Sequence, residues 1–395
     1  MSNQTMYRQV YLLTGSQALF QTISIMVMTI GGLAGALLAS KPEYATLPIA
    51  SMFFGTAVMM FPASIFMNKF GRRIGFICGA FLGVIGGVIA ASSLYFHSLF
   101  LLALGTSFIG GFQAFAQFYR FAASEVANDQ FRPKAISWVI AGGVVAALLG
   151  PTLANFGGNL FNLEYLGSFI ILTIVALLAI ALLFFLKIPH ITSTELNTTT
   201  SRSWKIIVTQ PTYFVALLVA ATGYGIMILG MTATPIAMKY LHYELGEITT
   251  VIQLHVLGMF LPSFFTGSLI TRFGSIRIIL AGIICFVGYI FVGTWSDSFY
   301  AFAIALTLLG IGWNFLFITG TTLLTATYTI EEKGKAQAIN DMVVFATGLV
   351  CSFSAAGLLN YLGWQNMNML LILWLVTITI VVIWFSLEPK SQIHN

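Results

Sequence analysis

Short segments that contain charged residues, Pro, Gly or Asn divide this sequence into twelve long apolar runs. A membrane-spanning helix needs about 20 predominantly apolar residues, and each run is long enough to supply one. Only 7% of the residues are charged and 58% are hydrophobic, whereas soluble proteins carry roughly 25% charged residues. These figures exclude a soluble globular protein, a coiled coil and a disordered chain, and they place the chain in a lipid bilayer.

The predicted spans fall into two groups of six. The first group is expected at residues 10–38, 47–68, 74–95, 99–126, 135–159 and 165–188. The second group is expected at residues 213–238, 248–270, 278–295, 299–328, 337–361 and 366–387. A polar stretch separates them, so we predict a first bundle over residues 1–188, a cytoplasmic linker over 189–211 and a second bundle over 212–395.

The basic residues predict the orientation of the chain. If the N-terminus lies inside the cell, 14 of the 17 Lys and Arg residues lie on the cytoplasmic side, Lys41 and Lys239 lie outside, and Arg120 lies within the fourth span. Because an excess of Lys and Arg marks the cytoplasmic side of a membrane protein, both termini are expected in the cytoplasm. The basic residues occur in twos and threes between apolar runs, which indicates contact with lipid and not with nucleic acid.

Two short motifs recur at about half the chain length. The segment 68–73, after the second span, matches 271–277 after the eighth span at an offset of 203. The segment 132–135, after the fourth span, matches 333–336 after the tenth span at an offset of 201, and this register pairs Gln113 with Asn314. Two matches at nearly one offset indicate that a six-span unit has been duplicated.

These features together resemble the major facilitator superfamily: six plus six spans, a polar central linker, and a Gly-x-x-x-Asp-Arg-x-Gly-Arg-Arg type loop after spans two and eight. The resemblance covers essentially the whole chain. It implies an all-α integral membrane protein with two pseudo-symmetric six-helix bundles around a central cavity. In the loop motif, Asn68 and Thr271 stand where the family has an acidic residue, which weakens a charge-relay role.

Ser64 stands where the first Gly of the motif is expected, whereas the second copy keeps this Gly as Gly267, and Gly71 and Gly274 remain in the two loops. Gly permits a tight reversal between two helices, and basic side chains hold the loop at the anionic inner leaflet. Asn68 and Thr271 are candidate caps of a neighbouring helix end. Topological anchoring and a role in gating both remain open for this set, which comprises Asn68, Gly71, Arg72, Arg73, Thr271, Arg272 and Gly274.

Several polar side chains inside the spans share one helical face. In the fourth span Gln113, Gln117 and Arg120 follow one another at spacings of four and three residues, which places them on one stripe of a helix. The superfamily lines its cavity with the first and fourth spans of each half. By this resemblance, and with the start of the eleventh span added, the candidate cavity residues are Gln17, Gln21, Gln113, Gln117, Tyr224, Asn314, Thr321 and Asn340.

Ionisable residues within the spans are candidates for proton coupling or gating, because a charge at mid-bilayer costs about 2.5–3.5 kcal/mol on insertion scales. Arg120 requires an anion, which Asp341, Glu125 or a bound substrate can supply. An Arg120–Asp341 pair is either an inner gate or a static contact, and Asp341 is the candidate proton carrier. Glu125 is expected to be solvated near a loop. His255 either titrates near neutral pH or is satisfied by a local hydrogen bond.

The sequence contains no paired catalytic carboxylates, metal-ligand cluster, nucleophile elbow or phosphate-binding loop. We therefore expect no enzyme, no catalytic residues, no metal site and no cofactor. We expect instead a monomeric secondary active transporter of the bacterial inner membrane, which moves a small organic solute by alternating access together with protons.

Three alternatives remain open at this point. A worn Gly-Pro motif at Gly150 and Pro151, similar to one in the proton antiporters of the superfamily, favours an exporter of amphipathic compounds or drugs. Arg120 favours a symport importer of an anionic metabolite, vitamin or siderophore. A membrane receptor or sensor is the alternative outside transport.

Overall fold

The computed structural model describes residues 3–128, 132–188, 202–329 and 332–387, and all the regular elements in these ranges are helices. The helices of the first half are α1 (Asn3–Leu38), the short 3₁₀ helix η1 (Pro42–Tyr44), α2 (Leu47–Phe70), α3 (Arg72–Tyr95), α4 (Leu99–Ala116), α5 (Tyr119–Val126), α6 (Arg132–Gly158) and α7 (Leu166–Leu183). The helices of the second half are α8 (Trp204–Val208), α9 (Pro211–Tyr240), α10 (Leu245–Phe260), α11 (Ser263–Phe273), α12 (Ser275–Trp295), α13 (Phe299–Thr325) and α14 (Lys333–Leu387).

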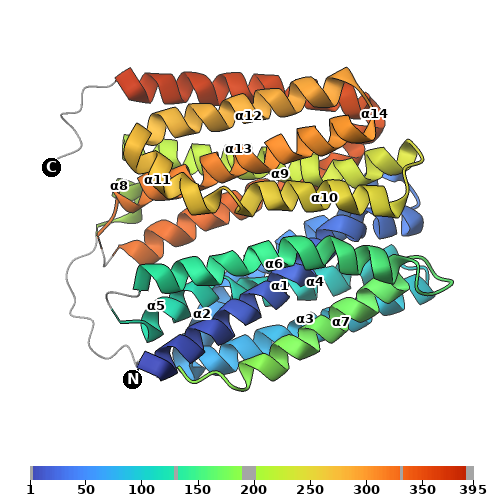
Figure 1. Cartoon of the computed structure of the whole chain (residues 1–395), viewed down its shortest axis with the longest axis horizontal. Helices are drawn as coiled ribbons and strands as arrows, with labels where there is room; N and C mark the ends of the chain where they lie inside the picture. Colours follow the sequence, from blue (N-terminus) through green and yellow to red (C-terminus); the bar gives the residue numbers. More distant parts are fainter. Residues whose placement is uncertain (1–2, 129–131, 189–201, 330–331, 388–395) are drawn as a thin grey trace.

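The helices form two bundles that lie side by side, one containing α1–α7 and the other α9–α14 (Figure 1). The bundles meet where α6 packs on α10, α2 on α14 and α1 on α9. Helix α1 begins and α14 ends at the same end of the molecule, which we call the terminus end, and η1 lies at the opposite, far end. Any cavity between these contacts is therefore lined by helices of both bundles.

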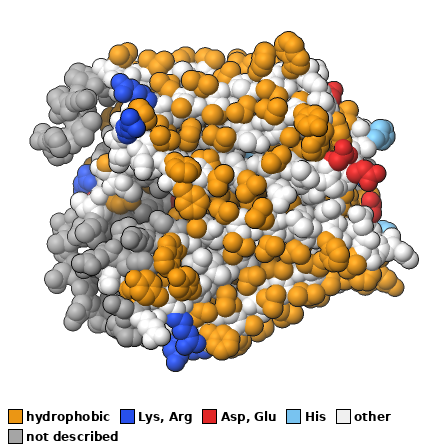
Figure 2. Space-filling view, viewed as in Figure 1, with side chains coloured by type: hydrophobic (Ala, Val, Ile, Leu, Met, Phe, Trp, Pro, Cys, Tyr) orange, Lys and Arg blue, Asp and Glu red, His pale blue; other side chains and the backbone are white. Residues whose placement is uncertain are grey.

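The outer surface matches a bilayer environment. Figure 2 shows hydrophobic side chains over the middle of the visible face, Lys and Arg at the terminus end, and Asp, Glu and His at the far end. Large apolar side chains such as Phe61, Ile284 and Trp295 are 70–78% exposed, which a soluble protein of this size would avoid. The lipid-facing surface and the two polar ends follow directly from the alternation of apolar runs and charged loops.

Three helical irregularities explain how the described helices give twelve spans. Ten helices are each long and apolar enough to cross a membrane, and the pair α10–α11, bent by 41° between Phe260 and Ser263, adds an eleventh. Helix α14 contains two spans that meet at Gly363, where φ is +73°. The predicted fourth span is also broken, between α4 and α5 at Gln117 and Phe118. The twelve-span, all-α prediction is confirmed, and the fourth and eighth spans are interrupted.

The two repeated loops turn at glycine, as predicted. Gly71 has a φ of +88° and Gly274 a φ of +82°, and each residue ends one helix and begins the next. Side chains with a Cβ adopt this conformation only rarely. Thr271 does not cap a neighbouring helix, because its hydroxyl donates to the carbonyl oxygen of Ser268 within its own turn. The Asn68 side chain lies outside the described part of the structure.

Basic residues of the first loop bind protein groups of their own bundle. Arg72 donates to both carboxylate oxygens of Glu125 on α5, at 3.2 Å from Nε and 2.5 Å from Nη2. Arg73 Nη2 donates to the carbonyl oxygen of Phe184 at 2.6 Å. Glu125 is exposed, as expected for a residue near a loop, and it is also ion-paired, because the α2–α3 loop folds back beside α5. Arg272, in the second loop, lies over the ring of Phe273 at 5.3 Å.

Closely packed glycines hold α2 against α4. A Cβ on Gly110 would overlap the carbonyl oxygen of Met52, and a Cβ on Gly55 would overlap that of Ser107. Small residues permit such backbone approach between helices in a membrane, where close van der Waals packing drives helix association. The separation of α2 and α4 is therefore fixed by backbone contact, and side chains that bridge the two helices have little freedom of distance.

The described end of the linker is fixed to the second bundle by an ion pair. Arg202 donates to Glu332 from Nε and from Nη2, both at 2.7 Å, and the Glu332 side chain is 2% exposed. Arg202 and Gln210 each donate to the carbonyl oxygen of Thr327 at 3.1 Å. The hydrogen bonds from Arg202 lower the pKa of Glu332 from 4.5 to about 2. Residues 202–211 therefore belong structurally to the second bundle, whereas residues 189–201 of the predicted linker lie outside the described ranges.

We predict that Glu332→Gln lowers the Tm of the purified protein at pH 7 by about 2–4 °C, the shift that roughly 1 kcal/mol gives in a large domain. Because the pKa of Glu332 is lower in the folded protein, its contribution to stability is present above pH 4.5 and is lost as the pH falls toward about 2. The difference in Tm between wild type and variant should shrink over that range. A difference that stays constant with pH would contradict this assignment.

A matched control is Glu164→Gln. Glu164 faces Lys239 at 3.9 Å, and both side chains are 50% exposed. Exposed ion pairs contribute little to stability, so this variant should unfold at the wild-type temperature.

Candidate substrate cavity

A cavity of about 650 Å³ lies between the two bundles. Its walls come from α1, α2, α4, α5 and α6 on one side and from α9, α10, α11, α13 and α14 on the other. Small-molecule sites in proteins typically occupy 300–1,000 Å³. The space is therefore of the right size for one organic solute, and both halves of the duplicated chain contribute to it.

The cavity contains most of the residues that the sequence singled out. Its lining includes Gln17, Gln21, Gln113, Gln117, Arg120, Tyr224, Thr321 and Asp341. Four other candidates are absent from the lining: Asn314, Asn340, Glu125 and His255. The helical periodicity of the polar residues thus identified the cavity-facing stripes of α1 and of α4–α5.

The two sides of the cavity differ in chemistry. The side formed by the first bundle carries four amide side chains, Gln17, Gln21, Gln113 and Gln117. The side formed by the second bundle carries the polar residues Ser263, Thr321, Thr322, Thr325 and Asp341 and also aromatic and thioether groups: Tyr224, Met227, Met231, Met259, Phe260, Trp313 and Phe317. We call these two surfaces the amide wall and the aromatic wall.

The aromatic rings of this wall contact one another. Trp313 and Phe317 are stacked, with ring centroids 4.9 Å apart and planes inclined by 12°. Tyr224 lies 6.1 Å from Phe317, and Phe260 lies 6.2 Å from Trp313. Sequence reasoning missed Trp313 and Phe317, although Trp313 directly precedes the candidate Asn314 in the repeated motif.

Two opposite charges face each other across the mouth of the cavity. Arg120 Nη2 on α5 and Asp341 Oδ2 on α14 are 3.8 Å apart, and their side chains are 35% and 33% exposed. The Arg120 guanidinium also lies 4.9 Å from the centre of the Phe121 ring. Asn340, which is 4% exposed, donates to Asp341 Oδ1 at 3.2 Å and so acts on the carboxylate without lining the cavity. The pair connects the first bundle to the second near the terminus end.

The sequence predicts Asn314 in the cavity lining, but the structure places it outside that lining. It is fully buried, and its Nδ2 donates to the carbonyl oxygen of Met259 at 2.6 Å and to Ser263 Oγ at 2.7 Å. Its Oδ1 accepts a hydrogen bond from Thr266 at 2.6 Å. Asn314 therefore connects α13 to both sides of the α10–α11 break, where the helical hydrogen-bond pattern is interrupted and polar groups need partners.

His255 is fully buried in the interface between α10 and α13. Its Nδ1 lies 2.8 Å from the carbonyl oxygen of Leu306. The sequence left two alternatives for His255, titration or a hydrogen bond, and this contact corresponds to the hydrogen bond, with a partner on the neighbouring helix α13. His255 does not belong to the cavity lining, although its neighbour Val256 does.

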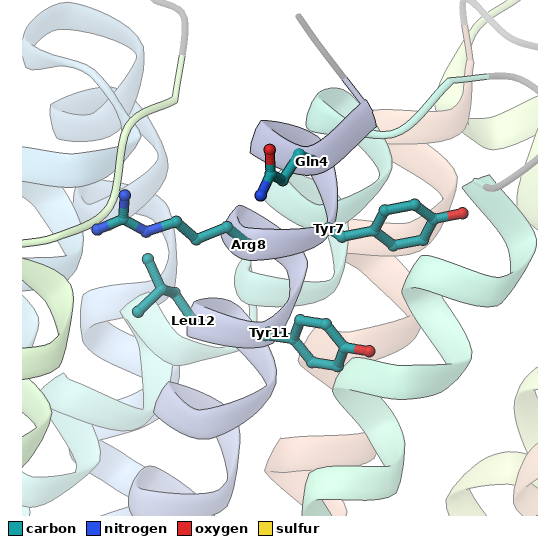
Figure 3. Close-up of a pocket in the computed structure, with 5 residues that line it drawn as sticks. All are labelled: Gln4, Tyr7, Arg8, Tyr11 and Leu12. Carbon is teal, nitrogen blue, oxygen red and sulfur yellow. The ribbon is translucent and has the colours of Figure 1, made fainter.

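A second depression lies on the outside of α1 and is lined by Gln4, Tyr7, Arg8, Tyr11 and Leu12 (Figure 3). In this view Arg8 and the two tyrosines point in opposite directions from the helix. Tyr11 stacks on Trp138 of α6 with ring centroids 5.2 Å apart. Aromatic and basic side chains at a helix end are typical of a membrane–water interface. The central cavity, and not this surface, is therefore the candidate substrate site.

The sequence profile of the Major Facilitator Superfamily matches residues 10–234 and 215–395. The chain belongs to the major facilitator superfamily. It is 37% identical to the riboflavin transporter RfnT of Brucella anthropi over 387 residues, which cover 97% of each chain. It is 28% identical to the uncharacterized MFS-type transporter YddS of Bacillus subtilis over 338 residues, 81% of this chain and 78% of that one.

A solved structure confirms the fold. The superfamily transporter FucP, crystallised in the outward conformation, superimposes with a TM-score of 0.62 over 96% of this chain and 99% of its own, at 14% sequence identity. The protein is thus a multi-pass membrane protein and a secondary transporter of the superfamily, as the loop motifs and the duplication indicated.

In this superfamily member the bundles also contact each other at the far end. Tyr361 of α14 donates to Glu43 of η1 at 2.6 Å, and Thr46 donates to the carbonyl oxygen of Phe353 at 3.5 Å. The Tyr361 hydroxyl lowers the pKa of Glu43, because the hydrogen bond favours the carboxylate. From these contacts we infer that the cavity is closed at the far end and that its mouth, with Arg120 and Asp341, lies toward the terminus end.

We predict that a cysteine at Thr321, which is exposed in the cavity, reacts with a membrane-impermeant thiol reagent applied from the terminus side. Thr319, on the same helix and fully buried, is the matched control and should not react as cysteine. Labelling is measured in vesicles of known sidedness, with Cys78, Cys285 and Cys351 replaced by Ala. Equal labelling from both faces, or of both positions, would contradict the described closure.

Proposed function

We propose that this transporter carries riboflavin, or a neutral flavin with the same ring system, across the membrane. The observation that carries the proposal is the 37% identity to a protein named as a riboflavin transporter, over 97% of both chains. Identity of that extent includes the helices of both cavity walls. The chemistry of the cavity supports the proposal independently.

The shape and polarity of a flavin correspond to the two walls. Its isoalloxazine group is flat and apolar on both faces, and aromatic side chains favour offset stacking with such rings. The stacked Trp313 and Phe317 offer a surface of this kind. The pyrimidine edge and the ribityl hydroxyls need hydrogen-bond partners, which the amide wall supplies. A cavity of about 650 Å³ accommodates one such molecule.

The charges at the mouth favour a neutral flavin over an anionic solute. Riboflavin carries no net charge, so it requires no cationic partner. Arg120 already faces the Asp341 carboxylate at 3.8 Å, and the amide wall contributes no charge. We therefore favour riboflavin over its phosphorylated derivatives and over the anionic metabolites expected from Arg120 alone.

We further propose that Asp341 carries the coupling proton. A carboxyl at the mouth of the cavity is accessible to water on one side of the membrane, and its protonation removes the attraction to Arg120. Loss of that attraction across the two bundles permits them to tilt. The excess of Lys and Arg at the terminus end supports a cytoplasmic location for both termini.

The direct test is transport by the purified protein in liposomes. We expect saturable riboflavin exchange, and accumulation when a pH gradient is imposed, with loss of accumulation on addition of a protonophore. The sign of the effective gradient distinguishes symport from antiport. Flavin mononucleotide should compete at least tenfold more weakly than riboflavin. Absence of saturable riboflavin exchange would overturn the proposed substrate.

If Asp341 carries the proton, its replacement should abolish gradient-driven accumulation but not exchange. Asp341→Asn should reduce gradient-driven riboflavin accumulation at least tenfold, because the amide cannot carry a proton, while exchange without a gradient continues. Asp297→Asn, in an exposed loop between α12 and α13, is the matched control and should behave as wild type. An Asp341→Asn protein that still concentrates riboflavin would exclude Asp341 as the carrier.

A further inference from the structure

Gln113 contacts a hydroxyl on a neighbouring helix. Thr56 of α2 is fully buried, lies outside the cavity lining, and donates to Gln113 Oε1 at 3.1 Å. Its hydroxyl is also within 2.9 Å of the Met52 carbonyl oxygen and 3.1 Å of that of Gly110. The close backbone packing at Gly55 and Gly110 fixes the distance between the two helices. Thr56 is thus a rigid partner for a side chain that is only 6% exposed.

The second half of the chain contains a related Thr–amide hydrogen bond, but there the amide binds only protein groups. Thr266 donates to Asn314, which occupies the repeat position of Gln113. Asn314 is one methylene shorter and uses its Nδ2 on Met259 and Ser263, so its amide is fully occupied by protein groups. In the first half Thr56 occupies the amide oxygen, and Gln113 lines the cavity. The amide nitrogen of Gln113 is then the group available to a solute.

We infer that Thr56 is a positioning residue that directs the Gln113 amide N–H groups into the cavity, where they donate to a carbonyl or ring-nitrogen acceptor on the edge of a flat heteroaromatic solute. The inference rests on the proposed function, since the pyrimidine edge of a flavin presents two carbonyl groups. Asn314, at the equivalent position, holds the bent α10–α11 helix and leaves its side of the cavity to aromatic stacking. At the two equivalent positions, Asn314 thus stabilises the bent helix and Gln113 binds the solute.

The test is a double-mutant cycle on riboflavin transport and binding. Thr56→Val and Gln113→Ala should each raise the KM for riboflavin about tenfold with little change in the maximal rate, since the first leaves the Gln113 amide unoriented and the second removes its hydrogen bond to the solute. The double variant should be no worse than Gln113→Ala alone, because Thr56 acts through Gln113. Thr56→Ser keeps the hydroxyl and should restore the wild-type KM.

Thr106→Val is the matched control. Thr106 is a fully buried residue of α4 whose hydroxyl donates only within its own helix, to Leu102 and Ala103. Its loss should leave the KM unchanged. The increase in Tm on addition of riboflavin gives a second measure of binding for each variant, and it shows whether Thr56→Val is folded.

The outcomes separate this inference from the proposed function. Two results would overturn the inference alone, provided that the wild type binds riboflavin saturably. One is additive effects of Thr56→Val and Gln113→Ala, and the other is an unchanged KM in either variant. Absence of riboflavin binding by the wild type would overturn the proposed substrate and the inference with it. A non-additive cycle with rescue by Thr56→Ser supports both.

Discussion

The need to satisfy backbone hydrogen bonds in a lipid environment determines most of this structure. Unpaired N–H and C=O groups are too costly in a bilayer, so the spans are helical and their outer surfaces are apolar. Irregular backbone is tolerated only where protein or a cavity surrounds it. The α4–α5 break at Gln117 and the α10–α11 break before Ser263 both lie in the cavity lining, and Asn314 supplies hydrogen bonds at the second. The same constraint therefore shapes both the exterior and the site.

Duplication produced two halves that have since diverged in shape. Pro62 lies inside the continuous helix α2, whereas Pro262 stands at the bend between α10 and α11. Nine residues separate Pro62 from Gly71, and twelve separate Pro262 from Gly274, a difference of three residues, close to one helical turn. Phe260 and Ser263, which flank the bend, and Phe264 line the cavity. The two halves therefore present differently shaped helices to the same cavity.

The sequence predicted those features that depend on local pattern. Apolar length identifies a span, charge identifies its ends, and a spacing of three or four residues identifies the face of Gln113, Gln117 and Arg120. It did not predict features that depend on which helices are neighbours. Glu125 pairs with Arg72 because a loop folds back, and Asn314 binds protein groups on both sides of the α10–α11 break while Gln113, at the equivalent position, lines the cavity. Trp313 and Phe317 are indistinguishable in sequence from aromatic residues that face lipid.

The amide wall has an electrical consequence. A neutral solute held by neutral amides moves no charge when the bundles tilt, so the membrane voltage performs no work on the solute itself. Moving one elementary charge across 100 mV is worth about 2.3 kcal/mol. In the proposed cycle only the proton on Asp341 experiences that energy. In that proposed cycle, recognition by hydrogen bonds instead of charge makes the affinity for the substrate independent of the voltage and of the salt concentration. Only the coupling step then depends on either of them.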